Sequence, residues 1–150
     1  MRCNAGVDPK LLMDQHLIAE YREIPMIIGG LKKNNYIYKA PIPEKLCLGT
    51  GHMTFWKNKL LYLKKRWDEI VKEMRRRGFK TNIVFEIPHD CPKYLINDWF
   101  PSKDESMIIR NRIKEKILLK PTFYKWQRIS IKDDPNWFIS QIMYSKTYFV

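Results

Sequence analysis

Residues 56–78, WKNKLLYLKKRWDEIVKEMRRRG, carry the most regular hydrophobic pattern of the chain. Apolar side chains recur there at alternating intervals of four and three residues, which aligns them along one face of an α-helix. Arginines then precede Gly78, and a glycine is typical of the position just after a helix C-terminus, where basic side chains favour the helix dipole. The segment therefore predicts a central core helix with a cationic end. Its apolar face consists of Trp56, Leu60, Leu63, Trp67, Ile70 and Met74.

A helix is also predicted before this segment. Asp8 followed by Pro9 is typical of a helix N-terminus, because aspartate caps the free N–H groups and proline fits the first helical position. Proline and paired glycines interrupt helices. We therefore expect this helix to kink or end at Pro25, and any continuation to end at Gly29 and Gly30.

A third helix is predicted from residue 104 to about residue 120, with three isoleucines as its buried stripe. Residues 32–47 and 80–102 contain several prolines and are predicted to be long loops. The sequence thus predicts an all-α fold. We expect residues 1–150 to form a compact single domain of about three main helices, with long loops and an aromatic-rich C-terminal extension. The isoleucine stripe is Ile109, Ile113 and Ile117.

The composition limits the kinds of partner. Lys and Arg number 28 against 16 Asp and Glu, a net charge of +12 in 150 residues, which favours a polyanionic partner, nucleic acid before an anionic membrane. We expect no membrane association, because no apolar run approaches the ~20 residues that span a bilayer. No secretory signal opens the sequence, so a cytoplasmic protein is expected. The three cysteines form no C-x-x-C pair, and we expect neither a metal nor a cofactor.

The C-terminal part of the third predicted helix carries the clearest candidate DNA contacts. Arg112 and Lys116 lie four residues apart and therefore share one helix face. Lys120 and Lys125 extend this basic surface into the aromatic segment 121–126, and interleaved cations and rings suit a DNA groove. The alternative is a solvated charged face beside ordinary core aromatics. The net charge favours nucleic acid.

Glu23 and His16 are candidates for chemistry, since they lie two helical turns apart with Arg22 beside Glu23. A carboxylate next to a cation can stabilise positive charge on a sugar or move protons. Spacing alone favours the simpler interpretation of solvent-facing helix residues. Residues 49–52, GTGH, lack the established phosphate-loop patterns and are expected to form a tight turn into the central helix.

Three blocks of sequence resemble one known family in the same order. They are DQHLIAEYREIP at residues 14–25, LGTGHMTF at 48–55 with its continuation from 59 to 79, and residues 112–116 with KPTFYK at 120–125. Together they are similar to the pyrimidine-dimer DNA glycosylase/AP lyase family, the endonuclease V type of T-even phages. The resemblance covers most of residues 1–126. Residues 127–150 are an extension to which it does not apply.

The resemblance implies a compact helical enzyme that removes an ultraviolet-linked pyrimidine and then cuts the strand without a metal. The family's nucleophile is the α-amine of a mature N-terminal threonine. Here Arg2 and Asn4 match family positions, so Met1 stands where that threonine belongs, and the bulky Arg2 should block removal of Met1. The resemblance therefore implies Met1 as the nucleophile and Glu23 as the catalytic carboxylate.

The resemblance also implies that this basic surface binds DNA. Expected contacts to the damaged strand and its phosphates are Arg2, His16, Arg22, Arg112 and Lys116, continued by Lys120 and the segment Phe123, Tyr124 and Lys125. Phe123 replaces a family tryptophan, and Met26 replaces a family arginine, which bears on lesion preference. We expect a monomer that acts on cyclobutane pyrimidine dimers in double-stranded DNA. The alternatives are the same chemistry on another base lesion, and a damaged-DNA-binding protein without catalysis.

Overall fold

The computed structural model describes residues 2–150, and helices form most of its regular structure. An antiparallel hairpin of two short strands is the sheet of the described chain. The mostly helical fold agrees with the prediction, but three main helices are too few. The α-helices are α1 (Asp14–Glu23), α2 (Met26–Lys33), α3 (Thr50–Phe55), α4 (Leu60–Arg76), α5 (Lys103–Leu119) and α6 (Pro135–Tyr144), and the strands are β1 (Lys125–Trp126) and β2 (Ile129–Ser130).

The predicted central helix is confirmed as α4. Its apolar stripe is buried, and Trp56 lies in a short 3-10 helix just before it. Gly78 has a φ of +77°, and the N–H of Phe79 donates to the carbonyl of Met74 over 2.9 Å. This is the glycine-terminated helix end that the sequence predicts, since a left-handed residue at that place lets the chain turn back on the last carbonyls.

The predicted third helix is confirmed as α5. Ser102 accepts from the backbone N–H of Glu105, and the Glu105 carboxylate accepts from the N–H of Ser102, so the helix begins with a capping box. Its isoleucine stripe is buried, as expected. Because the stripe occupies one face of α5, residues on its other faces can contact the N-terminal segment and the C-terminal tail.

The prediction for the N-terminal helix is partly wrong. Asp8 caps a 3-10 helix of only three residues, Pro9–Leu11, and α1 begins later, at Asp14. That helix ends before Pro25, as expected. Gly29 and Gly30 do not end the next helix but lie inside α2, because buried Ile27 and Leu31 anchor it to the core.

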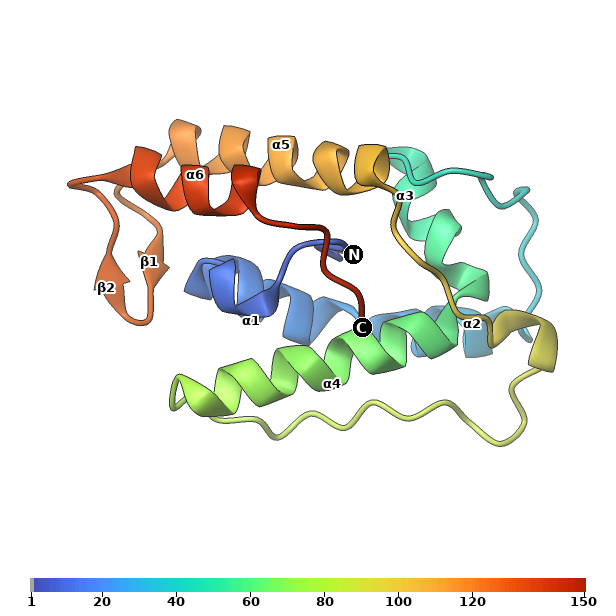
Figure 1. Ribbon diagram of the computed structural model, residues 1–150. Coiled ribbons are helices and arrows are strands. Elements are labelled where there is room, and N and C mark those ends of the chain that lie inside the picture. The colour runs from blue at the N-terminus through green and yellow to red at the C-terminus, as the bar shows by residue number, and fades with distance from the viewer. Residues whose placement is uncertain (1) are drawn as a thin grey trace.

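Figure 1 shows how these elements are arranged. Helices α5 and α6 lie side by side along one edge, α4 runs along the opposite edge, and α1 lies between them. The C-terminal tail passes the N-terminal segment, where the N–H of Tyr148 donates to the carbonyl of Gly6 over 3.0 Å. No helix in residues 2–150 is long and apolar enough to cross a membrane.

Asp14 joins the first helix to two distant parts of the chain. Its carboxylate accepts from the N–H groups of Gln127 and Arg128 at the turn of the hairpin, over 3.1 and 2.7 Å. It also accepts from the guanidinium of Arg77, just beyond α4, over 2.8 Å. Hairpin and α4 are therefore fixed against the start of α1, which places the aromatic segment beside that helix.

Candidate nucleic-acid interface

Glu23 lies at the C-terminal end of α1 and forms an ion pair with the residue that follows Met1. Its carboxylate is 3.6 Å from Nε of Arg2, and neither side chain is fully buried. Met1 itself lies outside the described residues. Glu23 therefore sits where the N-terminal segment meets α1.

His16, two turns earlier on α1, is almost fully buried with both ring nitrogens unsatisfied. Neither Nδ1 nor Nε2 has a hydrogen-bond partner among residues 2–150. Its ring stacks on Tyr124, with centroids 4.7 Å apart. Burial, followed by the charges of Arg112, Arg2 and Lys116, lowers the pKa of His16 to about 3. His16 is therefore a neutral imidazole surrounded by cations, with two buried ring nitrogens that lack a hydrogen-bond partner among residues 2–150.

Helix α5 supplies two of these cations. Arg112 and Lys116 share one of its faces, as their spacing predicts. The Nη2 of Arg112 donates to the carbonyl of Cys3 over 3.2 Å and to Oδ1 of Asn4 over 3.0 Å. Arg112 thus has two roles: it holds the N-terminal segment and contributes positive charge at His16. Lys116 is half-buried and contributes charge at the same place.

A buried ionic network beneath the site was not predicted from the sequence. Arg66 of α4 and Glu20 of α1 are both fully buried and form two hydrogen bonds, of 2.8 and 3.2 Å. The same carboxylate accepts from the backbone N–H of Asn4 over 3.1 Å and from its Nδ2 over 2.9 Å. Burial opposes the charge of Arg66, but Glu20 more than offsets this and holds the pKa of Arg66 above its usual value.

This network has a sequence signal that is easily overlooked. Arg66 lies beside the apolar stripe of α4, three residues after Leu63 and one before Trp67. A charged residue there must find a buried partner, because an unpaired buried charge costs several kcal/mol. Only the fold identifies that partner as Glu20, and only the fold shows that Glu20 then anchors Asn4.

The aromatic segment is fixed on α1 by Gln15. Its Nε2 donates to the carbonyl of Phe123 over 2.8 Å, and its Oε1 accepts from the N–H of Lys125 over 2.9 Å. Tyr124 is thereby buried against His16, while Phe123 is 57% exposed. An exposed aromatic ring next to a cationic cluster is suited to stacking on a nucleobase or sugar.

Besides Phe123, three of the predicted DNA contacts lie outside this cluster, and all three are cations. Arg22, Lys120 and Lys125 are exposed, and none of their side chains forms a hydrogen bond or ion pair with another described residue. Arg22 borders a separate shallow cavity of about 330 Å³ between α1 and the chain after α4. The structure therefore brings Arg2, His16, Glu23, Arg112, Lys116 and Tyr124 together and leaves the other cations around them.

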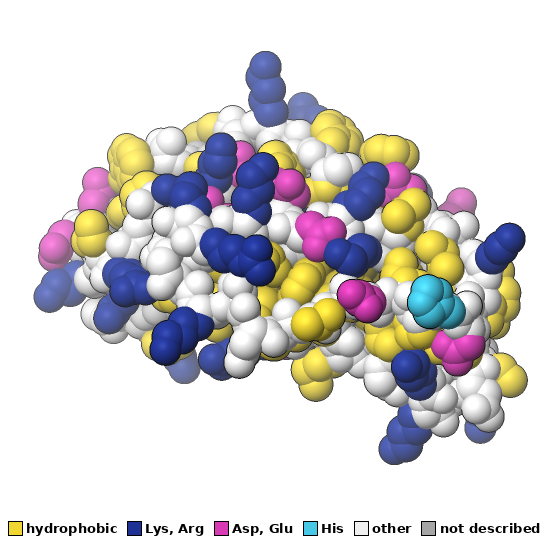
Figure 2. Space-filling view, turned by 90° about the horizontal axis from the view of Figure 1, so that it is seen from below, with side chains coloured by type: hydrophobic (Ala, Val, Ile, Leu, Met, Phe, Trp, Pro, Cys, Tyr) yellow, Lys and Arg dark blue, Asp and Glu magenta, His cyan; other side chains and the backbone are white. Residues whose placement is uncertain are grey.

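The positive charge of the molecule is not confined to this cluster. Seen from below, over α4, Lys and Arg side chains spread across the whole face with acidic side chains between them (Figure 2). The net charge therefore does not identify the interface by itself. The distinguishing feature of the cluster is that cations gather around a buried neutral histidine and one carboxylate. Within residues 2–150, no three His, Cys, Asp or Glu side chains gather in a way that could hold a metal ion.

The family model described as pyrimidine dimer DNA glycosylase matches residues 4–87, which is more than half of the chain. The match includes Asn4, His16, Glu20, Glu23 and Arg66. It does not include Arg2, the cations of α5, the aromatic segment or the C-terminal extension.

Proposed function

The chain belongs to the pyrimidine dimer DNA glycosylase family, and from this premise we propose that it excises cyclobutane pyrimidine dimers from double-stranded DNA and then cleaves the strand as an AP lyase. We propose that it acts as a monomer, with residues 1–150 forming one domain. The main support for this proposal is the ion pair of Glu23 with Arg2. It places the candidate catalytic carboxylate beside the N-terminal segment.

The nucleophile in this proposal is the α-amine of Met1. An α-amine has a pKa of about 7.7–8.0, against about 10.4 for a lysine side chain, so roughly a tenth of it is free base at neutral pH. A free amine is required for attack on C1′ of the damaged nucleotide. The Met1 side chain takes no part in this step, so methionine can replace the family's threonine chemically.

Each step can be written with its bonds balanced. The amine nitrogen forms a bond to C1′ while the bond from C1′ to the pyrimidine nitrogen breaks, and the electron pair leaves with the base, which takes up a proton. The nitrogen then passes a proton to the ring oxygen as the bond from C1′ to that oxygen breaks, and its lone pair forms the C=N bond of a protonated imine. Removal of a proton from C2′ then expels the 3′ oxygen and cuts the strand, and water hydrolyses the imine to restore the amine.

Glu23 is proposed to stabilise the positive charge on the sugar and the imine and to assist these proton transfers. A carboxylate beside a developing cation lowers its energy most where water is partly excluded. The Glu23 side chain is 29% exposed, so it is partly shielded and still accessible to DNA. Arg2 keeps the carboxylate close to the N-terminal segment before DNA arrives.

The DNA is proposed to lie across the cationic cluster. Arg2, Arg112 and Lys116 would neutralise phosphates of the damaged strand. His16 is buried beside them, and its unpaired ring nitrogens would contact the same strand once DNA binding uncovers the ring. Arg22, Lys120 and Lys125 would extend this contact, with Phe123 and Tyr124 as the aromatic surface. Expelling a base from the stack costs a few kcal/mol, and least where the pairing is already damaged.

The test is a gel assay on a duplex that carries one thymine dimer. We expect the wild type to cut the damaged strand, and Glu23→Gln to bind this duplex within about threefold of the wild-type Kd without cutting it. Glu86→Gln, an exposed change in the loop before α5, is the matched control and should cut normally. Cutting by Glu23→Gln would remove Glu23 from catalysis. Wild-type binding without cutting would favour another lesion or a protein that only binds.

A further inference from the structure

The N-terminal segment, residues 2–8, is held through its carbonyl groups by three arginines from two helices. Arg112 donates to the carbonyl of Cys3 over 3.2 Å, and Arg66 to that of Val7 over 2.7 Å. Between them, Arg110 donates to the carbonyl of Gly6 over 3.0 Å. Arg66 and Arg112 belong to the network and cluster already described, and Arg110 does not.

Arg110 lies on the face of α5 that points away from the cationic cluster. It is two residues from Arg112, and such residues project about 200° apart around a helix. Its guanidinium is buried, and all its acceptors are neutral oxygens. Burial therefore lowers the pKa of Arg110 below its usual value. The acceptors are Oγ of Ser106, the carbonyls of Gly6, Ile142, Ser145 and Lys146, and Oγ of Ser145.

Gly6 is the point at which the two chain ends meet. Its carbonyl also accepts from Oγ of Ser106 over 3.1 Å and from the N–H of Tyr148 over 3.0 Å. Its φ is +76°, and a Cβ at this position would lie 2.5 Å from Oγ of Ser106. The N-terminal segment is therefore pressed against α5 at Gly6 and held there by three donors.

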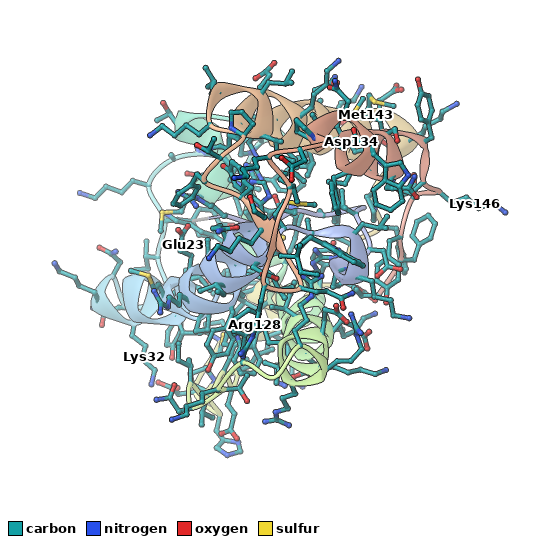
Figure 3. All side chains as sticks on the ribbon, turned by 90° about the vertical axis from the view of Figure 1, so that its left-hand side faces the viewer. Glu23, Lys32, Arg128, Asp134, Met143 and Lys146 are labelled. Carbon is teal, nitrogen blue, oxygen red and sulfur yellow. The ribbon has the colours of Figure 1, made fainter. Side chains whose placement is uncertain are left out.

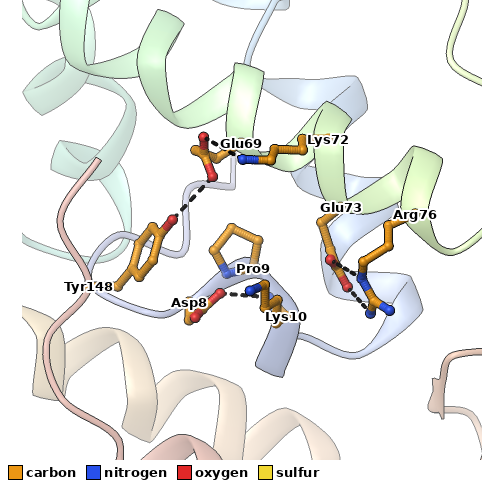
Figure 4. Close-up of a pocket in the computed structure, with 8 residues that line it drawn as sticks. All are labelled: Asp8, Pro9, Lys10, Glu69, Lys72, Glu73, Arg76 and Tyr148. Carbon is orange, nitrogen blue, oxygen red and sulfur yellow. Dashed lines mark hydrogen bonds and ion pairs between the residues drawn. The ribbon is translucent and has the colours of Figure 1, made fainter.

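The C-terminal tail, residues 145–150, completes this clamp. Arg110 holds the carbonyls of Ser145 and Lys146, and the Tyr148 hydroxyl donates to Glu69 of α4 over 3.1 Å (Figure 4). The tail thus spans from α5 to α4 across the N-terminal segment. Viewed from the hairpin side, Glu23 lies on one side of the molecule and Lys146 on the other (Figure 3). The segment is held from the side opposite the candidate catalytic carboxylate.

We propose that Arg110 and the C-terminal tail it holds position the reactive N-terminus by clamping the Gly6 carbonyl. This inference rests on the proposed function, and it gives a role to an extension that lies outside the family match at residues 4–87. The nucleophile is a backbone amine, so its place depends on how the following residues are held. Misplacement of a reacting group by about 1 Å can cost on the order of 100-fold in rate.

The test compares imine formation with DNA binding in full-length variants. Borohydride trapping is followed in a single turnover at saturating thymine-dimer duplex, and Kd and the unfolding midpoint are measured separately. We expect Arg110→Met to trap at least about tenfold more slowly than the wild type, with Kd within about threefold. Arg110→Lys, which keeps a cation and part of the hydrogen bonding, should recover part of that rate.

Leu95→Ala is the control for loss of stability alone. Leu95 is fully buried in the 3-10 helix Lys93–Leu95, which packs on the 3-10 helix before α4. It should lower the unfolding midpoint and leave the trapping rate unchanged. If Arg110→Met does not fold, Ser106→Ala replaces it, since it removes one donor to Gly6, and should slow trapping by about threefold or more.

Two results would overturn the inference in distinguishable ways. If the Arg110 and Ser106 variants trap at the wild-type rate, or slow no more than Leu95→Ala, the clamp has no positioning role while the proposed function stands. If the wild type itself forms no adduct on the dimer duplex, the proposed chemistry fails and the positioning role fails with it.

Discussion

His16 is buried as a neutral imidazole, so acid should destabilise the fold through this one side chain. Its pKa falls from an ordinary value near 6.5 to about 3, because it is buried and faces Arg112, Arg2 and Lys116, which all stay charged in this range. The unfolded chain therefore binds a proton below pH 6.5 that the folded chain does not. Stability from this source is fully present above pH 6.5 and is lost as the pH falls towards 3.

The size of the effect follows from these two pKa values. Between pH 7 and pH 5, selective protonation of the unfolded state should lower the free energy of unfolding by about 2 kcal/mol. The exact value of the folded pKa hardly changes this loss, since the folded form is still almost unprotonated at pH 5. The expected loss therefore depends chiefly on His16 being neutral when folded.

The assay is urea unfolding of the wild type and of His16→Gln at pH 7, 6 and 5. Burial also lowers the pKa of His52, to about 4, but His52 titrates in both proteins and cancels in the comparison. The wild type should lose about 2 kcal/mol more than the variant between pH 7 and pH 5. Equal losses in the two proteins would show that His16 is not held neutral, and would refute the electrostatic description of the site.

Further predictions concern single side chains. Lys116→Gln should reduce the slope of log K against log salt for duplex binding by about 0.9, whereas Lys114→Gln, on the α5 face towards α6, should not change it. Arg66→Met should lower the free energy of unfolding by about 3–5 kcal/mol in urea, and adding Glu20→Gln should restore part of it because no buried charge is left unpaired. Met26 is 66% exposed at the start of α2. Met26→Arg should tighten duplex binding and steepen the slope of log K against log salt. An unchanged slope would place residue 26 outside the DNA interface.

The sequence predicts those helices that carry a full apolar stripe or a complete set of end signals. Helices α4 and α5 both have the apolar stripe, with an end signal at Gly78 after α4 and a capping box at the start of α5, and their bounds fall within a few residues of the prediction. Helix α2 was predicted to be cut short because glycines are poor helix formers, yet burial of Ile27 and Leu31 outweighs that local cost. Helix α6 has Asp134 as its N-cap and Pro135 as its first residue, the same start signal as Asp8 and Pro9. The aromatic residues that follow do not form a regular apolar stripe that would predict a helix there.

The candidate site was only partly predictable for a different reason. The i, i+4 spacing on α5 and the two-turn spacing on α1 place Arg112 and His16 on definite helix faces. That these faces meet depends on contacts between distant residues. The Glu20 carboxylate that holds Asn4, and the Gly6 carbonyl that receives Arg110, have no local sequence signal because their partners lie on other helices.

Identification of the amine that forms the imine is the sharpest test of the proposed mechanism. The protein is trapped with borohydride on a thymine-dimer duplex and cleaved before aspartate, which releases residues 1–7. That peptide contains no lysine, so an adduct on it can be carried only by the α-amine. We expect the adduct on this peptide. An adduct on a lysine-containing peptide, or strand cleavage without any trapped adduct, would contradict it.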